Sequence, residues 1–269
     1  MNPLTHKGTA LVTGASSGIG AVYADRLARQ GYDLILVARN QDRLDTLASR
    51  LKRETGRSVE VVAADLGSTP GIRQVEEVLR TDAGITMLVN NAGIGATAPL
   101  VQSDPDQLDA MIALNVVSLT RLTYAAAQAF VQRGAGTIVN IASIVAIAPE
   151  MLNGVYGGTK AFVLAFSQSL HHELSKQGVR VQVVLPGAIS TEFWDIAGMP
   201  VKNLPQSIVM TADNLVDAAL AGLELGELVT IPSLPEAAQW DAVDAARKAL
   251  GPNLSATQPA ARFKVKIAA

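Results

Sequence analysis

Residues 9–20 read Thr-Ala-Leu-Val-Thr-Gly-Ala-Ser-Ser-Gly-Ile-Gly and decide the fold. The apolar run at their start predicts a buried strand, and the amphipathic pattern that continues to about Gln30 predicts a helix. Three glycines therefore lie between a strand and a helix. Gly14 permits a tight turn, Gly18 lets a phosphate approach the helix N-terminus, and Gly20 lets the helix pack closely on the strand. A plain turn would need only one glycine, so the stretch predicts a dinucleotide-binding turn.

The order of strand and then helix repeats along the chain. Short, apolar and mostly β-branched runs predict strands at residues 9–12, 33–38, 59–63, 87–90, 137–141, 179–185 and 228–231. Asn40 and Asp104 stand where they can cap two of the intervening helices. This alternation predicts an α/β fold of three layers, doubly wound in the Rossmann manner, with a central and mostly seven-stranded parallel sheet. We expect one domain over residues 1–251 and a C-terminal tail over 252–269.

The composition limits the class of protein that the chain can form. Its 269 residues are 49% hydrophobic and 17% charged, with a formal net charge of −2, so neither nucleic acid nor an anionic membrane is an expected partner. The chain has no cysteine and no cluster of metal-ligating residues, so we expect no metal. Residues 1–7 lack the apolar centre of a secretory signal, and no apolar run reaches transmembrane length. These features predict a cytoplasmic protein.

Tyr156 and Lys160 form a second informative pattern together with Ser143. Residues four apart share one face of a helix, so the phenol and the ammonium would project together. The cation would lower the pKa of the phenol from about 10 toward the working range. Ser143 could donate a hydrogen bond to a substrate oxygen. Taken alone, this spacing is more simply explained by an amphipathic tyrosine beside a solvated lysine.

The motifs taken together resemble those of the classical short-chain dehydrogenase/reductase family. The residues that carry the resemblance are Thr13 to Gly20, Asn90-Asn91-Ala92-Gly93, Asn115, Ser143, Tyr156, Lys160 and Pro186-Gly187. They follow the family's order and spacing, and the likeness covers about residues 7–230. Gly157 and Gly158 depart from the serine or alanine that is commoner there. Glycine destabilises the interior of a helix, so its presence at these two positions needs a reason. The two reasons considered are tight packing on a neighbouring helix and a locally wider site.

The resemblance implies an NADPH-dependent carbonyl reductase or alcohol dehydrogenase that transfers hydride between nicotinamide and an apolar ketone or secondary alcohol. The implied catalytic residues are Asn115, Ser143, Tyr156 and Lys160, with Asn115 holding a water in a proton relay. The implied cofactor-binding residues are Gly14, Ser16, Ser17, Gly18, Ile19, Gly20, Arg39, Asp65, Leu66, Asn91, Ala92, Gly93, Tyr156, Lys160, Pro186, Gly187, Ile189 and Thr191. Arg39 would accept the 2′-phosphate of NADP, whereas an acidic residue there would select NAD.

Several of these residues have a second explanation. Arg39 is otherwise a solvated loop residue, Asp65 a turn residue, Asn91 a brace of the sheet and Asn115 a satisfied core asparagine. Two other functions also stay open. A catalytically idle NADP-binding redox sensor would not need the complete set of Ser, Tyr, Lys and Asn, and the spacing of the glycines disfavours the epimerase–dehydratase branch of the superfamily.

The sequence also makes predictions about substrate and assembly. Residues from about 188 to 205 combine large apolar side chains with glycine and proline, which is typical of a lid over the substrate or of a loop packed on itself. The candidates for lining the substrate pocket are all apolar or small: Ile94, Gly95, Val145, Met151 and Val155. The helices expected over 104–133 and 155–176 are apolar on more than one side, which predicts a homodimer or homotetramer.

Overall fold

The computed structural model describes residues 6–264, which divide into two compact units. The first unit ends at Pro232 and the second begins at Ser233. The second unit contains helix α9 (Ala237–Ala249) and the 3-10 turns Gly251–Asn253 and Ala261–Phe263. The division seen in the structure lies before α9, and the expected domain range of 1–251 with a tail from 252 stays a prediction.

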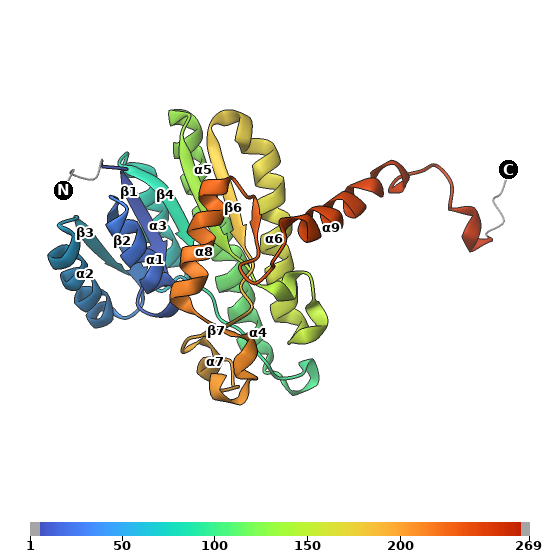
Figure 1. The fold of residues 1–269 in the computed structure, drawn as a ribbon, viewed down its shortest axis with the longest axis horizontal. Helices are drawn as coiled ribbons and strands as arrows, with labels where there is room; N and C mark the ends of the chain where they lie inside the picture. The colour runs from blue at the N-terminus through green and yellow to red at the C-terminus, as the bar shows by residue number, and fades with distance from the viewer. Residues whose placement is uncertain (1–5, 265–269) are drawn as a thin grey trace. The chain divides into compact units, whose positions relative to one another are not determined.

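A seven-stranded parallel sheet forms the centre of the first unit, with the strand order β3-β2-β1-β4-β5-β6-β9 (Figure 1). The strands are β1 (Thr9–Thr13), β2 (Asp33–Ala38), β3 (Val59–Ala63), β4 (Ile85–Asn90), β5 (Gly136–Ile141), β6 (Val179–Val184) and β9 (Val229–Thr230). The predicted fold class is confirmed. The strand order reverses between β1 and β4, and doubly wound folds bind their ligands at such a reversal, beyond the carboxyl ends of the strands.

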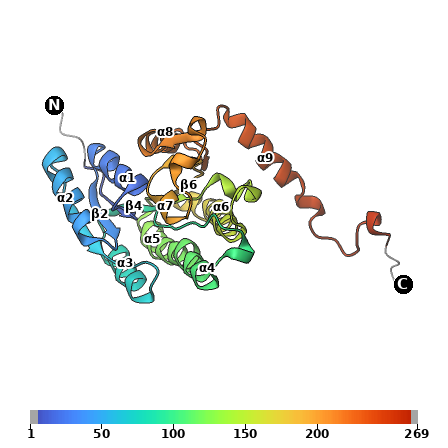
Figure 2. The same ribbon diagram turned by 90° about the horizontal axis from the view of Figure 1, so that it is seen from below.

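Helices cover both faces of this sheet (Figure 2). One face carries α1 (Gly18–Arg29), α2 (Gln41–Thr55) and α8 (Ala212–Leu225), and the other carries α3 (Thr69–Thr81), α5 (Leu119–Arg133) and α6 (Gly154–Leu174). Successive strand residues point to opposite faces, so Ala10 belongs to the first core cluster and Leu11 to the second. Because both faces are buried, the strands read as continuous apolar runs, and this made them predictable.

Helix α4 (Pro105–Ile112) continues into α5 through a π-helical segment, Ala113–Ser118, that contains Asn115. The helix is therefore distorted at Asn115. The whole stretch Pro105–Arg133 is long and apolar enough, by length and composition alone, to cross a membrane. This differs from our expectation that no run reaches that length. The packing of α5 on α3, β4 and β5 accounts for its buried apolar side chains.

The segment predicted as a lid contains more regular structure than the sequence suggested. β7 (Ala188–Ser190) pairs in parallel with β8 (Val209–Thr211), and α7 (Phe193–Ile196) lies between them along the chain. The 3-10 turns of the first unit are Leu100–Gln102, Ile144–Ala146, Pro149–Met151, Ser175–Gln177, Val201–Asn203 and Gln206–Ile208. Asn40 and Asp104 cap α2 and α4 as predicted, since each side chain accepts a backbone N–H bond of 3.0 Å.

Candidate active site

The glycine turn after β1 has the shape expected of a phosphate-binding turn. Gly14 and Gly18 have φ values of 64° and 53°, a region that glycine adopts without strain. A Cβ on Gly14 would lie 2.9 Å from the Cα of Ala92, and one on Gly20 would lie 2.3 Å from the carbonyl oxygen of Gly14. Ser17 occupies the N-cap position of α1 without a side-chain cap bond. The residues present therefore fit a bound phosphate group at this helix N-terminus.

Asn91 braces the turn from the end of β4. Its Nδ2 donates to the carbonyl oxygens of Thr13 at 2.9 Å and Gly14 at 3.2 Å. The hydroxyl of Thr13 in turn accepts from the backbone N–H groups of Asn91 and Ala92, at 3.0 Å each. These bonds show the structural role that we gave as the second explanation of Asn91, and they join the ends of the two strands that flank the reversal.

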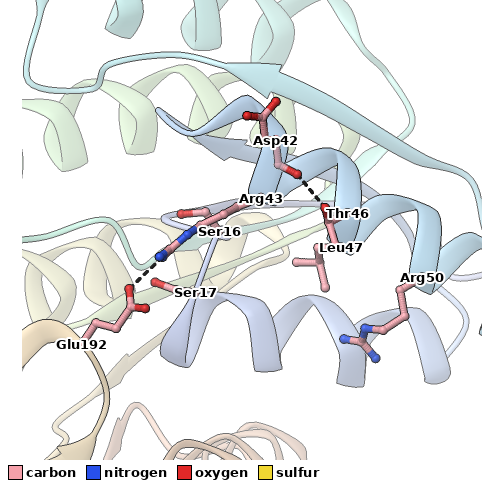
Figure 3. A pocket seen from close by; sticks show the side chains of 8 residues that line it. All are labelled: Ser16, Ser17, Asp42, Arg43, Thr46, Leu47, Arg50 and Glu192. Atoms are coloured by element: carbon pink, nitrogen blue, oxygen red, sulfur yellow. Dashed lines mark hydrogen bonds and ion pairs between the residues drawn. The ribbon is translucent and has the colours of Figure 1, made fainter.

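Arg39 follows β2 and is exposed, and no partner for its guanidinium occurs within residues 6–264. Nearby lies a pocket lined by Ser16, Ser17, Asp42, Arg43, Thr46, Leu47, Arg50 and Glu192 (Figure 3). Across this pocket Arg43 donates to Glu192 at 2.7 Å, so that α2 is tied to the segment after β7. The hydrogen bond with Arg43 lowers the pKa of Glu192 below its usual value.

Arg43 is a residue that the sequence reasoning missed. It lies four residues after Arg39 in the first turn of α2, and this spacing could have indicated that both arginines lie near the end of β2.

Asp65 acts as a turn residue, which was the second explanation given for it. Its Oδ1 accepts from the backbone N–H of Gly67 at 3.0 Å and closes a turn. Leu66 beside it is buried.

The four predicted catalytic residues are all buried in the first unit. Asn115, Ser143, Tyr156 and Lys160 are 2%, 8%, 6% and 7% exposed. Tyr156 and Lys160 lie in the first two turns of α6, and Ser143 follows β5. Four residues that are distant in sequence are thus contributed by the π-helical segment, by the end of β5 and by α6. Asn153, which was not predicted, caps α6 by accepting from the N–H groups of Val155 and Tyr156 at 2.9 and 3.2 Å.

Asn115 is satisfied by protein groups. Its Nδ2 donates to the carbonyl oxygen of Ile94 at 2.8 Å and to Thr159 Oγ1 at 3.1 Å, and its Oδ1 accepts from the N–H of Ile94 at 3.0 Å. Lys160 Nζ donates to the carbonyl oxygen of Ile141 at 2.9 Å. A Cβ on Gly93 would lie 3.1 Å from Asn115 Oδ1 and 3.5 Å from Lys160 Nζ, so Gly93 is seated beside both. This arrangement agrees with the description of Asn115 as a satisfied core asparagine.

Burial shifts both titratable groups on α6. It raises the pKa of Tyr156 to about 12, and a hydrogen bond with Ser143 opposes part of that rise. It lowers the pKa of Lys160 to about 8. Lys160 Nζ lies 5.8 Å from the centroid of the Tyr156 ring. Contrary to our expectation, the pKa of the Tyr156 phenol is thus raised rather than lowered, because the effect of burial is not offset by Lys160.

The surroundings of Tyr156 are apolar. Met111, Val145 and Tyr156 form a buried cluster, against which Ile94, Val155 and Phe193 pack. Three of the predicted pocket residues, Ile94, Val145 and Val155, thus gather around Tyr156. Met151 lies in a 3-10 turn and is 55% exposed.

The segment after β6 lies beside both halves of the site. Ser143 Oγ donates to the carbonyl oxygen of Pro186 at 3.4 Å, and a Cβ on Gly187 would lie 3.8 Å from Ile144. A Cβ on Gly18 would lie 3.1 Å from Thr191 Cγ2, so Thr191 faces the start of α1. Ile189 is buried in the core cluster that contains α1. The structure therefore brings the predicted cofactor and catalytic residues to one end of the sheet.

Comparisons with known proteins identify the family of the chain. The family model described as short chain dehydrogenase matches residues 8–198, and the chain belongs to this family. It is therefore an oxidoreductase that acts on CH–OH or carbonyl groups with NAD(P).

Individual relatives extend over most of the chain. A short-chain dehydrogenase from Sphingobium yanoikuyae in complex with NADPH is 52% identical, with a TM-score of 0.91 over 94% of this chain and 98% of that one. A bulky-bulky ketone specific alcohol dehydrogenase from Comamonas testosteroni is 45% identical, with a TM-score of 0.89 over 96% and 99%. Human 17-beta-hydroxysteroid dehydrogenase type 3 is 33% identical over 81% of this chain and 68% of its own length.

Proposed function

We propose that the protein is an NADPH-dependent reductase of apolar ketones, and a dehydrogenase of the matching secondary alcohols. The observation that carries the proposal is the buried group of Ser143, Tyr156 and Lys160 within an apolar cluster, beside a glycine turn shaped for a phosphate. Bound cofactor supplies the hydride, and the chain supplies proton transfer, orientation and exclusion of water.

Tyr156 is the proton donor in this proposal. A phenol carries its proton at neutral pH, so Tyr156 can give it to a carbonyl oxygen as negative charge develops there. Ser143 donates a second hydrogen bond to the same oxygen. Lys160, already close to the ring, favours the phenolate that remains. Asn115 ties the loop after β4 at Ile94 to the helix at Thr159 beside these groups.

The preference for NADPH rests on the charges at the end of β2. Arg39 is exposed and has no partner in the part of the chain that the structure describes, and a planar guanidinium binds a 2′-phosphate through two hydrogen bonds. Arg43 and Ser17 lie at the adjacent pocket and offer further donors. The complex of the Sphingobium yanoikuyae relative with NADPH supports this choice.

The apolar character of the substrate rests on what surrounds Tyr156. Ile94, Val145 and Val155 pack at the phenol, so the substituents of a carbonyl bound there would meet apolar side chains. The specificity of the Comamonas testosteroni relative for bulky ketones supports the same class of substrate.

The decisive experiment is the consumption of NADPH with a panel of aliphatic and aryl ketones, compared between wild type and Tyr156→Phe. This substitution removes the transferable proton and little volume, so turnover should fall by about 10²–10⁴-fold while binding of NADPH, measured by fluorescence, persists. Near-normal activity of Tyr156→Phe would contradict the mechanism. NADPH binding without turnover of any ketone by wild type would favour the redox-sensor alternative.

A further inference from the structure

The ring of Phe193 covers the ring of Tyr156. Their centroids are 5.8 Å apart and the two planes meet at 44°. On its other side the Phe193 ring meets Trp194 edge-on, with the centroids 5.7 Å apart and the planes at 90°. Trp194 is buried, and its Nε1 donates to the carbonyl oxygen of Ile189 at 2.9 Å. The tryptophan is therefore anchored to β7 and gives the Phe193 ring a fixed support.

Gly95 provides the space that this ring occupies. A Cβ on Gly95 would lie 2.3 Å from Cζ of Phe193 and 2.9 Å from its Cε2, which no real contact allows. Gly95 is not among the glycines with positive φ, so its backbone would accept alanine. The missing side chain thus serves packing rather than backbone conformation, and the Phe193 ring fills the gap between residue 95 and Tyr156.

We propose that Phe193 is a specificity-determining residue that sets the size of the second substituent on the substrate carbonyl. The inference rests on the proposed function, in which a carbonyl oxygen reaches the phenol of Tyr156. The two substituents of that carbonyl must then lie in the apolar cluster where the Phe193 ring already stands. A ketone whose second substituent is a methyl group can bind with the Phe193 ring in place. A ketone with two large substituents requires the ring to move away from Tyr156.

The connections of this segment allow such a movement. Glu192 is held by the exposed ion pair to Arg43 at 2.7 Å, and the carbonyl oxygen of Ala197 accepts from Thr97 Oγ1 at 2.7 Å. Gly198 follows with a φ of 91°. The Phe193 side chain makes no hydrogen bond, so rotation of the side chain displaces the ring at a cost that consists mainly of its contacts with Tyr156 and Trp194.

The test compares kcat/KM for acetophenone, which carries one methyl and one phenyl group, with that for benzophenone, which carries two phenyl groups. Removing the two aromatic contacts in Phe193→Ala should raise the ratio of benzophenone to acetophenone by about tenfold or more. Phe193→Leu should give an intermediate ratio. Leu225→Ala, a truncation at a site that is 80% exposed on α8, is the matched control and should leave the ratio unchanged.

Gly95→Ala provides an independent arm. Its methyl group would push the Phe193 ring aside, so this substitution should change the ratio of benzophenone to acetophenone when Phe193 is present. In the Phe193→Ala background the same substitution should change that ratio by less than about twofold. Additive effects of the two substitutions would contradict the contact that the inference uses.

The outcomes separate this inference from the proposed function. If wild type reduces both ketones and the ratio is the same in folded Phe193→Ala, the inference is overturned and the proposed function stands. If wild type reduces neither ketone with NADPH or NADH, the proposed function fails for these substrates. In that case the affinities of diphenylmethanol and 1-phenylethanol, the alcohols that match the two ketones, are measured by calorimetry in wild type and Phe193→Ala. Equal preferences in wild type and Phe193→Ala would overturn the inference there too.

Discussion

Tyr156 and Lys160 have pKa values that burial shifts in opposite directions. Water stabilises the charged form of each group, and its removal raises the pKa of the phenol to about 12 and lowers the pKa of the ammonium to about 8. Both shifts favour the uncharged species.

The shift of Lys160 predicts how stability depends on pH. Below pH 8 both the folded and the unfolded protein carry the Lys160 charge, and the folded state bears the full cost of burying it. Between pH 8 and 10.5 the folded protein loses this proton while the unfolded protein keeps it, so stability rises with pH. The effect is at most about 3 kcal/mol. Lys160→Met should therefore be more stable than wild type at neutral pH, by a margin that narrows toward about pH 10.

Urea denaturation without cofactor measures this margin. Lys176→Met is the control, because Lys176 is exposed near the end of the same helical region and its substitution should give no pH-dependent difference. A margin for Lys160→Met that stays constant with pH would show that the buried ammonium does not titrate as proposed.

Cofactor choice also belongs to single residues. Arg39→Asp removes a guanidinium that is proposed to meet the 2′-phosphate, and it places a carboxylate where the ribose hydroxyls of NAD could donate. Charge-assisted hydrogen bonds are worth about ten- to a hundredfold in affinity, so kcat/KM should shift toward NADH by at least that factor. Arg53→Asp makes the same charge change at an exposed position farther along α2 and should leave the ratio of NADPH to NADH unchanged. A wild type that already prefers NADH would contradict the assignment.

Among the helices, α6 carries both the acid–base pair and two glycines that weaken it. A Cβ on Gly157 would lie 3.4 Å from Pro149, whereas a Cβ on Gly158 would have no atom within 4 Å. Within residues 6–264, no neighbouring helix lies against the position of a Cβ on either glycine. The tight packing that we considered is thus limited to an ordinary contact of Gly157 with a 3-10 turn.

Gly158→Ala should accordingly stabilise the protein by about 0.5–1 kcal/mol without changing turnover, since alanine restricts the unfolded chain and is favoured in a helix. Gly56→Ala is the matched control, because its Cβ also has no atom within 4 Å but its φ is 70° at the end of α2. That variant should be destabilised. Thermal unfolding compares the two, and destabilisation by Gly158→Ala would instead indicate a partner packed on this face of α6.

At the scale of the whole molecule, large apolar side chains remain exposed on the long helical region that was expected to pair with a second copy. Tyr124 on α5 is 64% exposed, Val117 in the π-helical segment is 45% exposed and Phe162 on α6 is 38% exposed. Their helices already bury an apolar stripe against the sheet, so these residues form further apolar surface.

We expect a homodimer or homotetramer in which these residues are covered. Light scattering of the wild type at micromolar concentration should show a multiple of the monomer mass, and the double variant Tyr124→Asp with Phe162→Asp should lower it. Leu225→Asp, at an equally apolar and more exposed position on α8, should keep the wild-type mass. A monomeric wild type would rule out the expected assembly.

Much of the architecture could be predicted from local patterns in the chain. Most strands were visible because they are buried on both faces. The starts of α2 and α4 were visible because Asn40 and Asp104 are capping residues that act within one turn. Tyr156 and Lys160 lie close together, as their spacing predicted, because residues four positions apart share one face of a helix. In each case the physical cause acts over a few residues, so the sequence records it directly.

The remaining features depend on contacts between distant parts of the chain. Arg43 meets Glu192 across 149 positions, Asn115 meets Thr159 across 44, and the Phe193 ring rests on Tyr156 and above Gly95. The pKa shifts of Tyr156 and Lys160 likewise follow from burial by several elements at once. Such contacts arise only when the sheet orders its strands and the helices close over it. No local pattern specifies which side chain fills a particular gap, because that is decided by the packing of the folded chain as a whole.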